Sequence, residues 1–104
     1  MENTTALTTA STNQTFKQRL SQALTYTKHS SRVDQITNSL PSALATITDL
    51  KPYLDHITSL TGPWVSYDDD YAVELHMTVT YSGGSRKVMA RFIVGPREST
   101  MTAT

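Results

Sequence analysis

Three consecutive aspartates, Asp68, Asp69 and Asp70, form the densest group of acidic side chains in the sequence, and Glu74 and His76 follow shortly after them. Carboxylates and imidazole rings are ligands of divalent metal ions. A calcium loop, however, spaces its oxygen ligands at alternate positions and needs a glycine at its sharp bend, and this run has neither feature. The pattern therefore favours a solvated turn, whose charge also protects a sheet edge, over a metal site.

A second group with the residue types for chemistry consists of Glu74, His76 and Arg91, which the expected strands place near one another on the outer face of a sheet. A histidine titrates near neutral pH and a neighbouring carboxylate can hold its tautomer, as in a general acid–base site. An open sheet face excludes no water and positions no substrate, which argues against catalysis there. The sequence also lacks the nucleophile-elbow, zinc-protease, phosphate-loop and dinucleotide motifs. We therefore expect no enzyme activity, no catalytic residue, no metal and no cofactor.

Basic side chains gather in the first helical segment, where Lys17, Arg19, Lys28 and Arg32 occur with no acidic residue between positions 15 and 33. Such a helix face suits contacts with the phosphate backbone of duplex RNA, as in a small viral RNA-binding or silencing-suppressor protein. The whole chain, however, has 9 basic and 9 acidic residues, and its zero net charge argues against binding dominated by phosphate neutralisation. Nucleic-acid binding by these four residues is therefore the alternative function, and a solvated helix face is the simpler interpretation.

The composition limits the class of protein further. A chain of 104 residues is enough for one domain, and the lack of cysteine excludes disulfides, thiolate metal sites and thiol catalysis. No apolar run reaches the ~18–20 residues of a membrane span. The first residues also lack the basic and apolar regions of a signal peptide. We therefore expect a soluble intracellular protein, either cytoplasmic or nuclear.

The elements that must position these side chains fall into a helical half and a sheet half, so the predicted fold class is α+β, with one domain over residues 15–96. Residues 1–14 are rich in threonine and contain a single leucine, which predicts a disordered tail. Two to four helical segments are expected over 15–61. Thr15 begins a capping-box pattern, and the stretch after it is either one helix over 16–39 or two shorter ones.

Further along the helical half, apolar residues recur at spacings of 4, 3, 4 and 3, as the a and d positions of a heptad do. The residues with this spacing are Ala43, Ile47, Leu50, Leu54 and Ile57. The last four form either part of the core or a second contact surface.

The sheet half is predicted over 63–95 as a three-stranded antiparallel meander, because Thr61-Gly62-Pro63 ends the helical half and the apolar period then changes to 2. Trp64–Tyr67 is the short first strand, alternating residues over 71–81 form the second, and Lys87–Val94 forms the third. Residues 97–104 are expected to be a second flexible tail.

A two-residue turn at Gly83-Gly84 would set the register of the last two strands. On the inner face it places Val79 opposite Val88, with three further apolar pairs beside them. On the outer face it places His76 opposite Arg91.

The return strand is apolar on both faces and lies at the edge of the predicted sheet, where a second copy of the chain could pair with it. The residues expected to make this contact are Trp64, Met89, Phe92, Ile93 and Val94. A body of about 80 residues is small for a core that must stand alone, which favours association. We therefore expect a non-enzymatic protein-interaction module that forms a homodimer or small oligomer. The chain has 18 Thr and 11 Ser, and small hydroxyl-rich chains with disordered ends and no enzymatic motif are common among viral accessory proteins.

Overall fold

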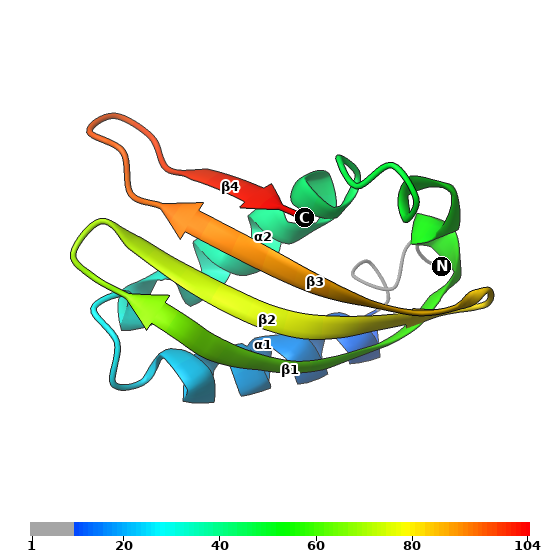
Figure 1. Cartoon of the computed structure of the whole chain (residues 1–104). Coiled ribbons are helices and arrows are strands. Elements are labelled where there is room, and N and C mark those ends of the chain that lie inside the picture. Colours follow the sequence, from blue (N-terminus) through cyan, green and yellow to red (C-terminus); the bar gives the residue numbers. More distant parts are fainter. Residues whose placement is uncertain (1–9) are drawn as a thin grey trace.

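A computed structural model describes residues 10–104, with their side chains from Thr15 onward (Figure 1). Two helices come first, α1 (Ala10–Leu24) and α2 (Val33–Leu44), joined through the short 3-10 helix η1 (Ser30–Arg32). A second 3-10 helix, η2 (Lys51–His56), leads into the sheet. The strands follow in the order β1 (Ile57–Asp68), β2 (Ala72–Tyr81), β3 (Gly84–Ile93) and β4 (Thr100–Ala103).

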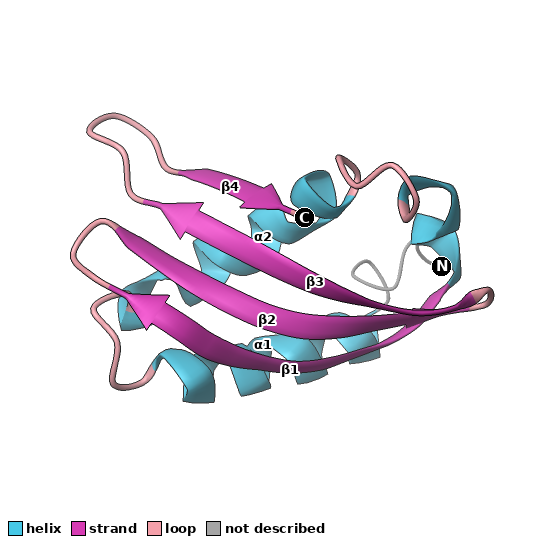
Figure 2. Cartoon of the chain, in the orientation of Figure 1, coloured by secondary structure: helices cyan, strands magenta, loops and turns pink. Residues whose placement is uncertain are grey.

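The described residues form two layers, with both α-helices on one side of the sheet (Figure 2). Each strand is antiparallel to the next, in the spatial order β1-β2-β3-β4. Helix α1 packs mainly against β1, and α2 packs against β4 and α1. The opposite face of the sheet carries no helix within residues 10–104. The predicted α+β class is confirmed, but the sheet has four strands in this range and not three.

Helix α1 begins at Ala10, so the last five positions of the predicted N-terminal tail are helical and Thr15 lies inside the helix rather than at its cap. The rest of that predicted tail, residues 1–9, lies outside the described residues. Phe16, Leu20 and Leu24 are all fully buried, as the spacing of one helix face requires. The chain leaves the helix after Leu24, so 16–39 forms two helices and not one.

The heptad-like residues do not form a helix. Helix α2 ends at Leu44, and Ile47 and Leu50 lie in turns, while Ile57 already belongs to β1. Pro52 lies in the first turn of η2, since a proline has no N–H to offer a continuing helix. Ile47, Leu50 and Ile57 are buried in the core, and half-buried Leu54 packs against it, so this group forms core and not a contact surface.

Strand β1 is far longer than predicted and runs through Gly62-Pro63, which does not end the helical half. The peptide bond between these two residues is cis. The register with β2 shifts between Thr61 and Trp64, and Gly62 has a φ of 96°, a value that L side chains rarely adopt. The glycine and proline therefore form a bulge within the strand, as these residue types commonly do in edge strands.

The hairpin between β2 and β3 has a register two residues away from the predicted one. Tyr81 pairs with Gly84, so Ser82 and Gly83 form the turn, and Gly84 takes the positive φ of 139°. Because side chains alternate with a period of two, this shift leaves every residue on its predicted face. It changes the partners: Glu74, and not His76, lies opposite Arg91.

Strand β4 overturns the prediction of a flexible tail over 97–104. Its residues pair with β3 from Ala90↔Ala103 to Ile93↔Thr100, and Ala103 is buried against the core. Met101 also packs on the core. Strand β3 is consequently an inner strand, and the prediction that it forms the sheet edge is wrong.

Candidate interaction surface

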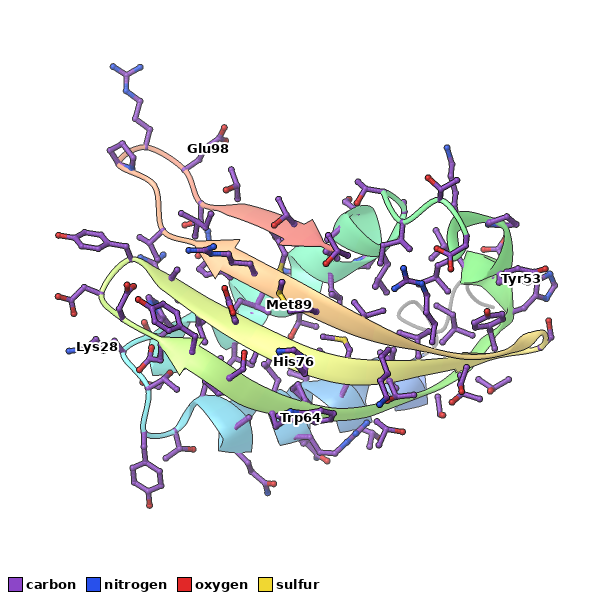
Figure 3. The ribbon with its side chains drawn as sticks, in the orientation of Figure 1. Lys28, Tyr53, Trp64, His76, Met89 and Glu98 are labelled. Carbon is purple, nitrogen blue, oxygen red and sulfur yellow. The ribbon has the colours of Figure 1, made fainter. Side chains whose placement is uncertain are left out.

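The uncovered face of the sheet carries a row of large side chains that crosses the strands. Trp64 of β1 is the register partner of His76 in β2, and His76 is the partner of Met89 in β3. The indole and imidazole rings stack with their centroids 6.0 Å apart and 17° between their planes. Figure 3 shows the three side chains on the same face. Trp64 is 52% exposed, so half of the largest side chain in the protein faces solvent.

A second row on this face, parallel to the first, is charged. Glu74 and Arg91 are direct register partners, and their side chains form an ion pair of 3.6 Å. Tyr67 of β1 lies opposite Glu74 on the other side. Arg91 therefore neutralises the carboxylate that an acid–base pair with His76 would require, and His76 stacks on Trp64 instead.

Of the five residues predicted to make a contact, three lie on the open face. Trp64 and Ile93 are exposed and Met89 is half-buried. Phe92 is 1% exposed, and its inclusion in the contact surface was wrong, because the alternation that turns Ile93 outward turns Phe92 toward the helices. Val94 is half-buried and packs against the core.

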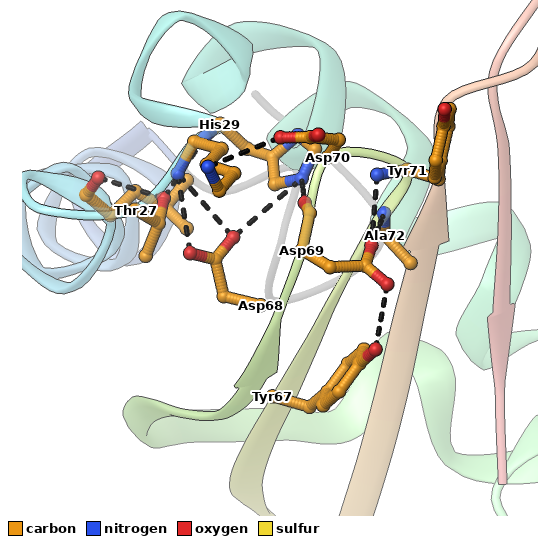
Figure 4. A network of polar contacts seen from close by, with 10 residues as sticks. Thr27, His29, Tyr67, Asp68, Asp69, Asp70, Tyr71 and Ala72 are labelled. Atoms are coloured by element: carbon orange, nitrogen blue, oxygen red, sulfur yellow. Dashed lines mark hydrogen bonds and ion pairs between the residues drawn. The ribbon is translucent and has the colours of Figure 1, made fainter.

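The acidic turn between β1 and β2 is held by its own side chains (Figure 4). One carboxylate oxygen of Asp69, Oδ1, accepts the backbone N–H groups of Tyr71 and Ala72, each at 2.8 Å. The other, Oδ2, accepts the hydroxyl of Tyr67 at 2.6 Å. The hydrogen bond from Tyr67 and those from the backbone lower the pKa of Asp69, and the same carboxylate raises the pKa of Tyr67.

The turn also holds the segment between α1 and η1. His29 is 2% exposed, and its Nε2 lies 2.6 Å from the backbone carbonyl oxygen of Asp69. Because a carbonyl only accepts, that nitrogen carries a hydrogen. The carboxylate of Asp68 accepts the backbone N–H of Lys28, and the Lys28 ammonium lies 3.2 Å from Asp70. In the described part of the chain, no group of three or more potential ligands is arranged to hold a metal ion.

The four basic residues of the alternative function each have a partner within the protein. Arg19 donates to the backbone carbonyls of Leu60 and Gly62 in β1. The remaining three pair with polar side chains: Lys17 with Asp34, Lys28 with Asp70, and Arg32 with Gln35. These cations come from α1, the connecting segment and η1. No local pattern in the sequence indicates that Arg19 links α1 to the sheet.

Among the described residues, no helix is both long and apolar enough to cross a membrane. No protein-family model, no curated protein and no solved structure matches this chain.

Proposed function

We propose that this chain is a non-enzymatic interaction module that associates with a second copy of itself through the open face of its sheet. The observation that carries the proposal is the row of exposed Trp64 and half-buried His76 and Met89 on a sheet face that no described helix covers.

The composition of this face supports association. Tryptophan, methionine and arginine are enriched at the centres of protein interfaces, and the rim of an interface is polar. Here the Trp64–His76–Met89 row lies beside the Glu74–Arg91 pair. Threonines surround both rows: Thr61, Thr78, Thr80, Thr100 and Thr102. Burial of apolar surface contributes about 25 cal/mol per Å², so covering the exposed half of the Trp64 indole would add substantially to the free energy of association.

The size of the face is also adequate. The four strands have 12, 10, 10 and 4 residues. With a rise of about 3.3 Å per residue and a spacing of about 4.8 Å between strands, they give a flat area on the order of 600 Å². Side chains make the accessible area larger than the flat area, so a full contact approaches the ~800 Å² per partner of a specific interface.

The sheet edges are poorer contacts than the face. In β1 the carbonyls of Leu60 and Gly62 already accept hydrogen bonds from Arg19. At the other edge, β4 has only four residues, which is a short template for an added strand.

The experiment is sedimentation velocity on the full chain from about 1 µM to about 100 µM, the range in which association of micromolar affinity appears. We expect a dimer at the upper end, and a shift of the tryptophan emission to shorter wavelength as the dimer forms, because Trp64 is the only tryptophan. Trp64→Arg should leave a folded monomer. Tyr26→Arg is the matched control, since Tyr26 is a 98% exposed aromatic residue in the turn after α1. A wild-type chain that remains monomeric at 100 µM overturns the proposal.

A further inference from the structure

We infer that the second copy packs on the open face with its two-fold axis parallel to the strands, between β2 and β3, so that Glu74 of each copy faces Arg91 of the other. This inference rests on the proposed function and adds the orientation of the partner. It follows from the rows of residues that the strand register creates.

The geometry is that of two sheets packed face to face. Aligned sheets keep their strand directions within about 30°, so residues at the centre of the face remain opposite one another. An axis parallel to the strands places β2 of one copy over β3 of the other. Register partners within one sheet then become opposite residues between the copies, and the Glu74–Arg91 row generates two equivalent ion pairs across the interface.

The next row along the strands fits the same arrangement. His76 and Met89 are register partners, so the imidazole of one copy lies over the thioether of the other. On the far side of that row, Thr78 is the partner of Lys87. The ammonium group therefore faces a hydroxyl, and no like charges meet.

An axis that crosses the strands along the Trp64–His76–Met89 row gives an unfavourable arrangement. Each strand would then lie over its own copy, reversed in direction. Because Met89 lies midway between Lys87 and Arg91 on β3, this axis would place Arg91 of one copy over Lys87 of the other. Two like charges that face each other across the interface repel, whereas the parallel axis places Arg91 over a carboxylate.

Side-chain size favours the parallel axis as well. The bulky aromatic residues Trp64 and Tyr67 lie at the β1 end of the two rows. The β4 end carries threonines: Thr102 pairs with Arg91, and Thr104 exchanges backbone hydrogen bonds with Met89. The parallel axis places large residues over small ones, whereas the crossing axis places Trp64 over Trp64.

The test uses charge reversal in the full chain, with sedimentation velocity as the measurement and circular dichroism to establish folding. Glu74→Arg alone gives a row with two positive charges, and Arg91→Glu alone gives a row with two negative charges. Each variant should lose at least about tenfold in dimer affinity, because both ion pairs become repulsive. An equimolar mixture of the two should form heterodimers at close to wild-type affinity, and the double variant Glu74→Arg/Arg91→Glu should form homodimers again.

Lys87→Glu is the matched control, because it makes the same charge change as Arg91→Glu on the same strand and face. With the parallel axis its affinity should remain within about threefold of wild type. Tighter association of both Lys87→Glu and Arg91→Glu would instead establish the crossing axis. If the wild-type chain dimerises but the two charge variants neither weaken nor prefer each other, the orientation is wrong while the proposed function stands. A monomeric wild type refutes the proposed function itself.

Discussion

Replacing Arg19 with alanine tests whether a single side chain joins the helical layer to the sheet. Arg19 extends from α1, and its guanidinium donates to the backbone carbonyls of Leu60 and Gly62, on either side of the point where β1 departs from regular pairing. The contact is partly buried and joins residues more than forty positions apart in the sequence. Its loss removes charge-assisted donors from two carbonyls of an edge strand at the same time.

The magnitude follows from the number and kind of these bonds. A hydrogen bond to a charged group contributes about 1.5–3 kcal/mol, and water replaces part of that at a partly buried position. Two such bonds at the lower end give a loss of about 2–3 kcal/mol in the free energy of unfolding. For a domain of this size, that corresponds to a fall in Tm of about 8–12 °C.

The assay is urea unfolding followed by the fluorescence of Trp64, at two protein concentrations, so that dimer dissociation is separated from unfolding. Lys17→Ala is the matched control on the same helix. Its ion pair with Asp34 joins side chains that are 43% and 74% exposed, so its loss should cost less than about 1 kcal/mol. Arg19→Lys should recover less than half of the loss, because an ammonium group lacks the planar fork. An Arg19→Ala chain as stable as the Lys17→Ala chain would refute the reasoning.

Three further predictions concern the bulge, the acidic turn and the last strand. Gly62→Ala should destabilise the protein by more than about 1 kcal/mol, because φ is +96° and a Cβ would lie 3.1 Å from the Trp64 ring; an unchanged urea midpoint would contradict this. The pKa of Asp69 is lowered in the folded protein, so its contribution to stability is present above the unfolded-state pKa of about 3.9 and is lost as the pH falls through the folded value. Asp69→Asn should therefore lose less stability than wild type between about pH 5 and pH 2, and equal losses in urea titrations would count against it. In hydrogen exchange, the amides of Met89 and Thr104 should be protected, since each donates to the other's carbonyl, and exchange of Thr104 at the unfolded rate would exclude a stable β4.

The sequence alone predicts which side chains face the core much better than it predicts which residues pair. Alternation over 72–81 and 86–93 identifies the inner and outer faces of β2 and β3 correctly, because the period of a strand is local information. The register depends on the turn, and two adjacent glycines allow either of two turns. The observed one brings Arg86 within 2.9 Å of Asp49 and stacks Tyr81 on Tyr53, and both contacts are long-range.

The sequence does not predict strand β4, for a related reason. The residues of β4 are threonines with one methionine and one alanine, a composition that resembles a tail when considered alone. They become a strand because β3 offers an unpaired edge and because Ala103 and Met101 bury against the core. Similarly, the heptad spacing of Ile47 and Leu50 correctly indicates burial, but Pro52 and the turns before it prevent a helix.

The same distinction holds for the candidate surface: the sequence predicts which way its side chains point but not their contacts with distant segments. Outward placement of Trp64, Met89 and Ile93 could be predicted from alternation, and the burial of Phe92 follows from that same rule. The contact of His29 with the acidic turn and that of Arg19 with β1 join segments about forty residues apart. No local pattern encodes such contacts.

The two-residue difference in the hairpin register has a consequence for how this protein can change over evolutionary time. Moving the turn by one position, from Ser82-Gly83 to Gly83-Gly84, shifts the pairing of β2 and β3 by two residues but leaves the same side chains facing the helices, so the core would still be apolar. The outer rows would not survive, since Arg91 would then lie opposite His76, and Glu74 and His76 would lose Arg91 and Met89 as their register partners. Substitutions that move this turn therefore separate the two demands on the sequence: lineages that need only a folded domain tolerate them, and lineages that need the outer rows aligned do not.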